Sequence, residues 1–267
     1  MYTVYRQYDP NKTELIAKPF RMGANEPYIL KYLHSKPSPS PHIISLIETT
    51  PIISGRAWLI LPKMHTLNSL LIDSRGVCGR EQLSWGLIKG LAYLHEHNVA
   101  HRDIRPKNLV CDDDFRLKII DFDIAMEVHD ENTEIAESGI DYWTYWTAPE
   151  AHERNGPPLP MYSPIKADRW SCGKVIRHHL MAKNGNNCIS KFADQLMAND
   201  PQQRPPLPEW HKFLGALFSD VSHIPENGGQ ENSRPLQDMV EADRESITLP
   251  DSKRPRLELG NQGPRGP

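Results

Sequence analysis

The alternation of apolar and polar positions predicts that the N-terminal part of the chain is rich in β-strands. Residues 2–8 and 13–18 alternate well enough for two strands, and the Asp-Pro-Asn sequence at residues 9–11 is typical of a turn between them. The apolar runs at residues 43–47 and 57–61 predict two further strands. These four strands indicate a small sheet near the start of the chain.

Apolar residues at helical spacing predict helices after and between these strands. In residues 26–33 the apolar positions fall on one face of a helix, and Pro27 is tolerated there because it lies in the first turn. Leucines at positions 83, 87, 91 and 94 recur every three or four residues, which is the stripe of a buried helix. The polar residues 95–98 end that helix. We expect the chain from residue 67 onwards to be mainly helical.

A predicted hairpin places candidate metal ligands together. Short apolar runs at residues 109–110 and 117–120 flank an acidic turn, so they should pair as two strands. Because a hairpin brings its outer ends together, Asn108 and Asp121 should lie side by side, with Asp103 five residues before Asn108. Two side chains with oxygen ligands beside a free carboxylate are suited to holding Mg²⁺ on a phosphate while a hydroxyl loses its proton.

Composition narrows the class of protein. The chain has 267 residues, 38% of them hydrophobic, which is enough for a packed core. The net charge of −3 argues against a nucleic-acid-binding protein. The four cysteines have neither zinc-site nor disulfide-scaffold spacing, and no signal peptide or run of membrane-spanning length is present. We therefore expect a soluble, intracellular, cytoplasmic protein that binds neither nucleic acid nor membrane.

The region around the hairpin resembles the catalytic loop and metal loop of the eukaryotic protein kinases. Residues 101–103 read His-Arg-Asp, Asn108 follows at the family's spacing, and residues 121–123 read Asp-Phe-Asp. The family has glycine where this chain has Asp123. Further motifs of the family follow in order: Ala-Pro-Glu at residues 148–150, the Asp-x-Trp-Ser-x-Gly helix start at residues 168–173 and Asp-Pro-Gln-Gln-Arg at residues 200–204.

The resemblance implies a two-lobed α+β protein-kinase-like fold. The small β-rich N-lobe, at about residues 1–62, would be incomplete, and the larger, mainly helical C-lobe would span about residues 65–218. Residues 219–267 are rich in Gly, Pro, Asn, Glu and Ser, which predicts a disordered tail. The basic cluster at residues 253–256 in this tail has the composition of a nuclear import signal, and of ordinary solvated charge.

The resemblance also implies the roles of the site residues. Asp103 would be the base that accepts the proton of the substrate hydroxyl, and Asn108 and Asp121 would hold Mg²⁺. Lys18 would grip the phosphates of ATP and pair with Glu26. Around the catalytic and nucleotide sites, the remaining expected residues are Arg105 near the transferred phosphate and Ala17, Leu61, Met64 and Leu109 near the adenine. Arg105 stands where serine/threonine kinases usually carry lysine, which favours Ser/Thr substrates.

Other family positions imply supporting contacts. Phe122 should pack against Leu30 and His101, Asp168 should hydrogen-bond the catalytic loop, and Arg204 should form a buried pair with Glu150. In the activation segment, residues 124–147, Thr133 and Ser138 are candidate phosphorylation sites that would pair with Arg102.

Three departures from the family leave the activity open. The glycine-rich phosphate loop that precedes the lysine strand in the family is missing, through an incomplete start of the sequence or a real loss. Only eight residues lead from Lys18 to Glu26. Asp123 either stiffens the metal loop or repels nucleotide through its charge. The first interpretation is a protein kinase for Ser/Thr hydroxyls that uses ATP and Mg²⁺, and the alternative is a pseudokinase scaffold or a kinase fragment. The motifs at residues 148–150 and 168–173 disfavour a small-molecule kinase.

Overall fold

A computed structural model describes most of the chain before residue 211. The described residues are 1–5, 14–51, 56–67, 76–136, 145–151, 161–181, 188–207 and 210, and they lie in one compact unit that spans Met1–Ser222. The turn at residues 9–11, Ser138, the tail from residue 219 and its basic cluster lie outside the described residues.

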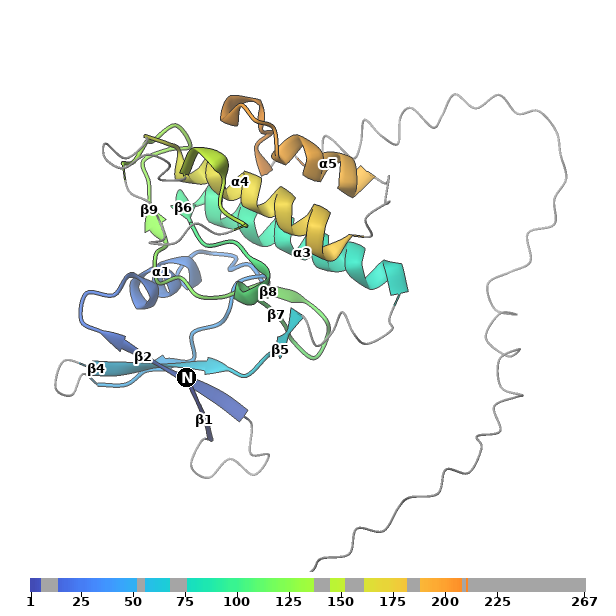
Figure 1. The fold of residues 1–267 in the computed structure, drawn as a ribbon. Helices are drawn as coiled ribbons and strands as arrows, with labels where there is room; N and C mark the ends of the chain where they lie inside the picture. The colour runs from blue at the N-terminus through green and yellow to red at the C-terminus, as the bar shows by residue number, and fades with distance from the viewer. Residues whose placement is uncertain are drawn as a thin grey trace, which may run out of the picture. The chain divides into compact units, whose positions relative to one another are not determined.

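The N-terminal part forms a four-stranded antiparallel sheet. Its strands are β1 (Tyr2–Tyr5), β2 (Glu14–Arg21), β3 (Glu48–Thr49) and β4 (Arg56–Pro62), in the order β1-β2-β4-β3. Figure 1 shows β1, β2 and β4 side by side below the helices.

The prediction of a strand at residues 43–47 is wrong. Only Ile43 makes a bridge there, to Ile119, and the regular strand β3 begins at Glu48. The start of this stretch pairs with the hairpin, because Ile44 N–H donates to Ile119 O over 3.1 Å and Ile119 N–H donates to His42 O over 2.8 Å. Its last residue meets the sheet, where Ile47 N–H donates to Ile60 O over 2.9 Å. The apolar run therefore reflects burial of Ile43 and Ile44 in the core rather than strand formation.

The two faces of the sheet bury different sets of side chains. On one face, Ile16, Leu59 and Leu61 join the main core together with α1 (Asn25–His34). On the other face, a separate small cluster contains Leu15, Ala17 and Ile60. This division follows the alternation of side chains along a strand and decides which residues can line a site beside α1.

The C-terminal part is mainly helical. Its helices are α3 (Gly76–Glu96), α4 (Pro164–Val175), which continues into a π-helix, η3 (Ile176–Leu180), and α5 (Cys188–Leu196). The predicted leucine stripe lies on α3. Ser163 caps α4 by accepting a hydrogen bond from Lys166 N over 3.2 Å, so this helix begins before the predicted start at Asp168.

A close approach of α4 and α5 requires glycine at position 173. A Cβ atom at Gly173 would lie 2.5 Å from Ala193 O, well inside van der Waals contact. The glycine of the Asp-x-Trp-Ser-x-Gly motif is thus a packing requirement of the helical lobe.

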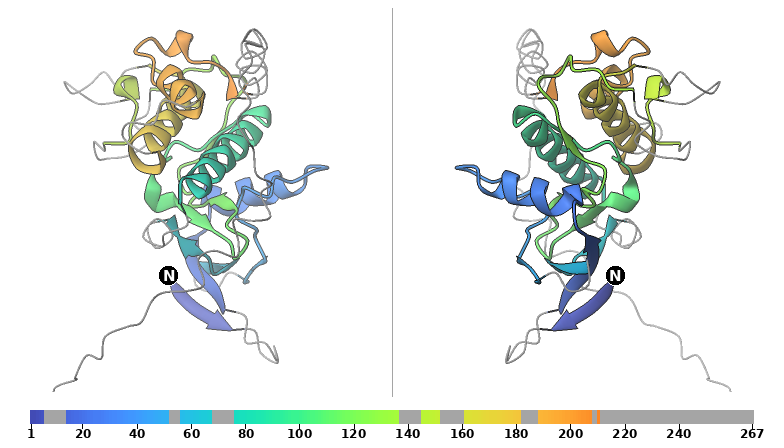
Figure 2. Two further views of the ribbon diagram at one scale, coloured as in Figure 1. Left: turned by 90° about the vertical axis from the view of Figure 1, so that its right-hand side faces the viewer. Right: turned by 90° about the vertical axis from the view of Figure 1, so that its left-hand side faces the viewer.

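Short strands and 3-10 turns complete the described structure. The predicted hairpin consists of β7 (Leu109–Cys111) and β8 (Leu117–Ile119), which β5 (His65–Thr66) extends, and β6 (Val99–Ala100) pairs with β9 (Met126–Glu127). The 3-10 turns are η1 (Pro106–Asn108), η2 (Pro149–Ala151) and η4 (Pro201–Gln203). In the side views the sheet lies at the lower end and α3, α4 and α5 lie at the upper end, with α1 at mid-height, as expected for a β-rich N-lobe and a helical C-lobe (Figure 2). Among the described residues, no helix has the length and apolar character to cross a membrane.

Candidate active site

Asp168 holds the loop that carries the candidate base. Its carboxylate accepts hydrogen bonds from His101 N over 2.6 Å and from Arg102 N over 2.8 Å. The His101 ring packs edge-on against Phe122 at 4.8 Å, and Phe122 shares the main core with Leu30. The contacts of Asp168 with the catalytic loop and of Phe122 with His101 are those predicted. Arg102 has φ of 69°, a conformation that non-glycine residues seldom adopt, and the fixed loop holds it there.

Asp103 lies between Asn108 and Arg105. Asn108 Nδ2 donates to Asp103 Oδ2 over 2.7 Å and to Asp103 O over 2.9 Å, and Arg105 Nε is 3.2 Å from Asp103 Oδ1. Burial raises the pKa of the Asp103 carboxyl above its usual value, although the Arg105 charge and the Asn108 hydrogen bond act in the opposite direction. A raised pKa makes a carboxylate a better proton acceptor.

The hairpin brings the two candidate metal ligands to neighbouring positions. Asn108 O accepts a hydrogen bond from Ile120 N over 3.0 Å, directly before Asp121. Because the amide nitrogen of Asn108 faces Asp103, its amide oxygen remains as the possible ligand atom. Oxygen atoms from an amide and a carboxylate are the ligands that Mg²⁺ prefers, so the donor set fits this metal.

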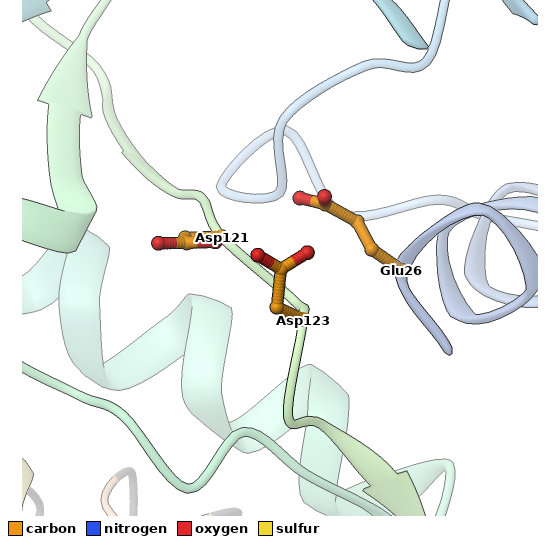
Figure 3. Close-up of side chains that lie close together, drawn as sticks. All are labelled: Glu26, Asp121 and Asp123. Atoms are coloured by element: carbon orange, nitrogen blue, oxygen red, sulfur yellow. The ribbon is translucent and has the colours of Figure 1, made fainter. Parts of the chain in front are cut away.

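Lys18 joins the nearby helix α1 to the metal loop, which is far away in the sequence. Its ammonium lies 2.6 Å from Glu26 Oε2 on α1, 2.6 Å from Asp121 Oδ1 and 3.1 Å from Asp123 Oδ1. Figure 3 shows Glu26, Asp121 and Asp123 grouped together, and one carboxylate oxygen of each lies within 4.8 Å of the others. The Lys18–Glu26 pair, expected by resemblance, is therefore present, and Asp123 adds a carboxylate to it.

Burial and charge act against each other in this group. Burial alone would lower the pKa of Lys18, but the Glu26 charge and the hydrogen bond to Asp121 raise it above its ordinary value. Burial raises the pKa of Glu26, which has no exposed surface, and the nearby Lys18 charge limits the rise. Phe122 N also donates to Glu26 Oε1 over 3.1 Å, which ties α1 to the metal loop. Lys18 is thus a protonated cation held by carboxylates.

The backbone at Asp123 does not need glycine. Among the described residues the positive φ angle of this loop is at Asp121, with φ of 69°, and Asp123 is not among the residues with positive φ. Asp121 can adopt this angle because aspartate tolerates the left-handed region better than most residues. Asp123 therefore occupies its position without the backbone strain expected where glycine is replaced. The property that distinguishes Asp123 from the glycine of the family is its charge.

The residues expected around the adenine lie on two sides of the sheet. Leu61, Leu109 and Met64 belong to the core cluster on the side of Lys18. Ala17 lies on the opposite face, which corrects its expected role, because neighbouring residues of a strand point to opposite faces. Ile16 lies two residues before Lys18 on β2 and therefore faces the same side of the sheet. The alternation of side chains along the strand would have identified Ile16, rather than Ala17, as the residue on the side of Lys18.

The activation segment is fastened to α4 by charged groups that the sequence analysis missed. Glu131 pairs with the buried Arg169, and Ser163 Oγ donates to Glu131 O over 2.6 Å. One turn away on α4, the buried Lys166 donates to Asn132 Oδ1 over 2.8 Å. The carboxylate of Glu131 thus holds this part of the activation segment on α4. No local pattern pairs these residues, which are more than thirty positions apart.

The candidate phosphorylation site Thr133 is hydrogen-bonded within a local turn. Thr133 Oγ1 donates to Asp130 Oδ1 over 3.3 Å in a local turn, whereas Arg102 Nη1 donates to Ile124 O over 3.3 Å. Two residues further on, Ile135 exchanges backbone hydrogen bonds of 3.0 and 3.1 Å with Tyr162.

Glu131→Gln is expected to loosen the activation segment. The substitution removes the charge that faces Arg169, so we expect the amide of Ile135 to exchange hydrogen roughly 3 to 10 times faster. Hydrogen exchange followed by mass spectrometry measures this effect. The control is Glu134→Gln, which changes an exposed residue of the same segment. Equal exchange in the two variants would show that Arg169 does not hold the segment.

Glu150 and Arg204 form the predicted pair inside the helical lobe. Arg204 Nη2 donates to Glu150 Oε2 over 2.9 Å, and its other nitrogens donate to Ala198 O over 3.0 Å and Lys166 O over 2.9 Å. The Arg204 side chain has no exposed surface. The buried positive charge of Arg204 is therefore neutralised by Glu150.

Known proteins to which the chain is similar are protein kinases. A family model described as the protein kinase domain matches residues 21–185. The chain is 32% identical over 157 residues to the serine/threonine-protein kinase CST20 of Candida albicans, covering 55% of this chain and 12% of that protein. It is 28% identical over 186 residues to mitogen-activated protein kinase 13 of Mus musculus, covering 65% and 44%. It is 28% identical over 138 residues to the serine/threonine-protein kinase chk1 of Schizosaccharomyces pombe, covering 51% and 26%. The chain thus spans less than half the length of each of these curated relatives.

Proposed function

The chain belongs to the protein kinase family, and from this premise we propose that it transfers the γ-phosphoryl group of ATP to serine or threonine hydroxyls of a protein substrate. The observation that carries the proposal is the convergence on Lys18 of Glu26 from α1 and Asp121 from the metal loop, at 2.6 Å each. This arrangement joins the sheet, α1 and the metal loop, and a fixed cation at this point supports a role in binding phosphates.

Each member of the site has a separate task in this reaction. Lys18 orients the phosphates, and the amide oxygen of Asn108 with the carboxylate of Asp121 would hold Mg²⁺. When magnesium ATP is bound, ATP supplies the phosphoryl group and the metal ion neutralises part of the charge of the phosphates. Asp103 accepts the proton of the substrate hydroxyl, and its hydrogen bond from Asn108 fixes the direction of its carboxylate.

Arg105 supports the choice of Ser/Thr substrates. Its guanidinium lies beside Asp103 and can contact the transferred phosphate from the position where serine/threonine kinases usually carry lysine. Two of the relatives named above carry serine/threonine-protein kinase in their names.

A second candidate function is that of a pseudokinase, which keeps the fold as a binding module without useful turnover. The observation that favours it is the Asp123 carboxylate, 3.1 Å from Lys18 on the side of the ammonium that faces the metal loop. An acid at this place competes with phosphate for the cation.

A titration of the purified protein with ATP, with and without Mg²⁺, tests the proposal. We expect Mg²⁺ to strengthen ATP binding by about tenfold or more and Asp121→Ala to abolish this gain, because the metal then loses its carboxylate ligand. The matched control is Asp113→Ala, which removes an almost fully exposed carboxylate from the β7–β8 turn. The absence of Mg²⁺-dependent ATP binding, or a gain that survives in Asp121→Ala, would contradict the proposed metal site.

A further inference from the structure

We propose that Asp123 is an intramolecular competitor for the phosphate groups of the nucleotide, and that it sets the affinity of this site for phosphorylated nucleotides. The inference rests on the proposed function, because it concerns the same nucleotide site.

Three carboxylates surround the ammonium of Lys18. Glu26, Asp121 and Asp123 place carboxylate oxygens at 2.6, 2.6 and 3.1 Å from Lys18 Nζ, and the Asp121 contact is a hydrogen bond. A phosphate oxygen that binds Lys18 therefore competes with these carboxylates for the same ammonium.

Asp123 is the group that a phosphate can displace. The Glu26 side chain is 1% exposed, and its other oxygen accepts a hydrogen bond from Phe122 N, so it is fixed from two sides. The Asp121 side chain is 30% exposed and makes the shorter contact. The Asp123 side chain is 56% exposed, makes the longest contact and can turn into solvent without leaving a buried charge.

Charge then makes the competition selective for phosphate. Three carboxylates around one ammonium leave an excess of negative charge next to the place where phosphates would bind, and like charges at this range repel. A ligand without phosphate does not meet this repulsion. Asp123 thus weakens the binding of ATP and ADP and leaves the binding of adenosine unchanged.

Two substitutions separate charge from backbone freedom. Asp123→Asn keeps the shape of the side chain and removes its charge, whereas Asp123→Gly also restores the residue found in the family. Because Asp123 does not have a positive φ angle, the backbone can keep its conformation in both variants. Asp113→Asn makes the same chemical change on an exposed residue outside the site.

Isothermal titration with ATP, ADP and adenosine in the presence of Mg²⁺ provides the test. We expect both Asp123 variants to bind ATP and ADP about tenfold more tightly than the unchanged protein. The affinity for adenosine should not change, and Asp113→Asn should behave like the unchanged protein for all three ligands.

Four results would overturn the inference, and they differ in what they say about the proposed function. Equal ATP affinity in the unchanged protein and Asp123→Asn would overturn the inference alone. Weaker ATP binding by Asp123→Asn would also overturn it alone, because Asp123 would then help to hold the metal. Tighter binding by Asp123→Gly only would assign the effect to the backbone. If neither ATP nor adenosine bound to any of the proteins, both the inference and the proposed function would fail.

Discussion

Replacing Asp103 by asparagine is expected to lower the rate of phosphoryl transfer by about 10² to 10⁴-fold while magnesium ATP still binds. The substitution keeps the size of the side chain and removes the group that accepts the proton of the hydroxyl. Asp103 contacts Asn108 and Arg105 and lies outside the carboxylate group around Lys18, so nucleotide affinity should change little. The measurement is a single-turnover assay with saturating ATP and a mixture of Ser/Thr peptides, beside an affinity titration.

The control for this prediction is Asp113→Asn, which should retain the rate of the unchanged protein. A rate in Asp103→Asn equal to that of the control would show that another group accepts the proton. If the unchanged protein bound magnesium ATP but showed no transfer above background, the pseudokinase function would be favoured instead.

Glu150→Ala is expected to destabilise the helical lobe by about 3 to 5 kcal/mol, a large part of the free energy of unfolding of a typical domain. The Arg204 side chain is fully buried and would keep its charge after the loss of the carboxylate. Its remaining hydrogen bonds go to the carbonyl oxygens of Ala198 and Lys166, which do not neutralise the guanidinium. Urea unfolding followed by circular dichroism measures the change.

The matched control removes the acid of an exposed ion pair. Glu14 pairs with Lys63 at 2.6 Å on the surface, and both side chains are more than 40% exposed. Because solvent screens such a pair, Glu14→Ala should leave the stability almost unchanged. If Glu150→Ala and Glu14→Ala had equal effects, the buried pair would not be a main contribution to stability.

Local patterns predicted the elements whose partners are close in the sequence. The β7–β8 hairpin has its strands and turn within residues 109–119, so apolar runs around an acidic turn were enough to place Asn108 next to Asp121. The α3 stripe was visible because helical spacing repeats every turn. The strand expected at residues 43–47 failed because an apolar run reports burial and does not say whether its backbone pairs in a sheet.

Local patterns and motifs also do not show which distant side chains will meet, and this explains the errors and omissions in the candidate site. Ala17 was placed in the site by motif resemblance alone, although alternation along β2 sends it to the opposite face from Lys18. The contact of Glu131 with Arg169 joins residues on separate elements, and no periodicity connects them. Resemblance to the family supplied the Lys18–Glu26 pair, which spacing by itself could not.

The sequence by itself determined the family, the periodic helices and strands, and the motif residues around Asp103 and Asp121. It did so because these features depend on residues that are neighbours along the chain or that match a known order. Only the tertiary structure decided that Asp123 would meet Lys18 and that Arg169 would hold Glu131. The partner of a charged side chain depends on which distant segments pack together, and that packing is set by the whole core rather than by any local pattern.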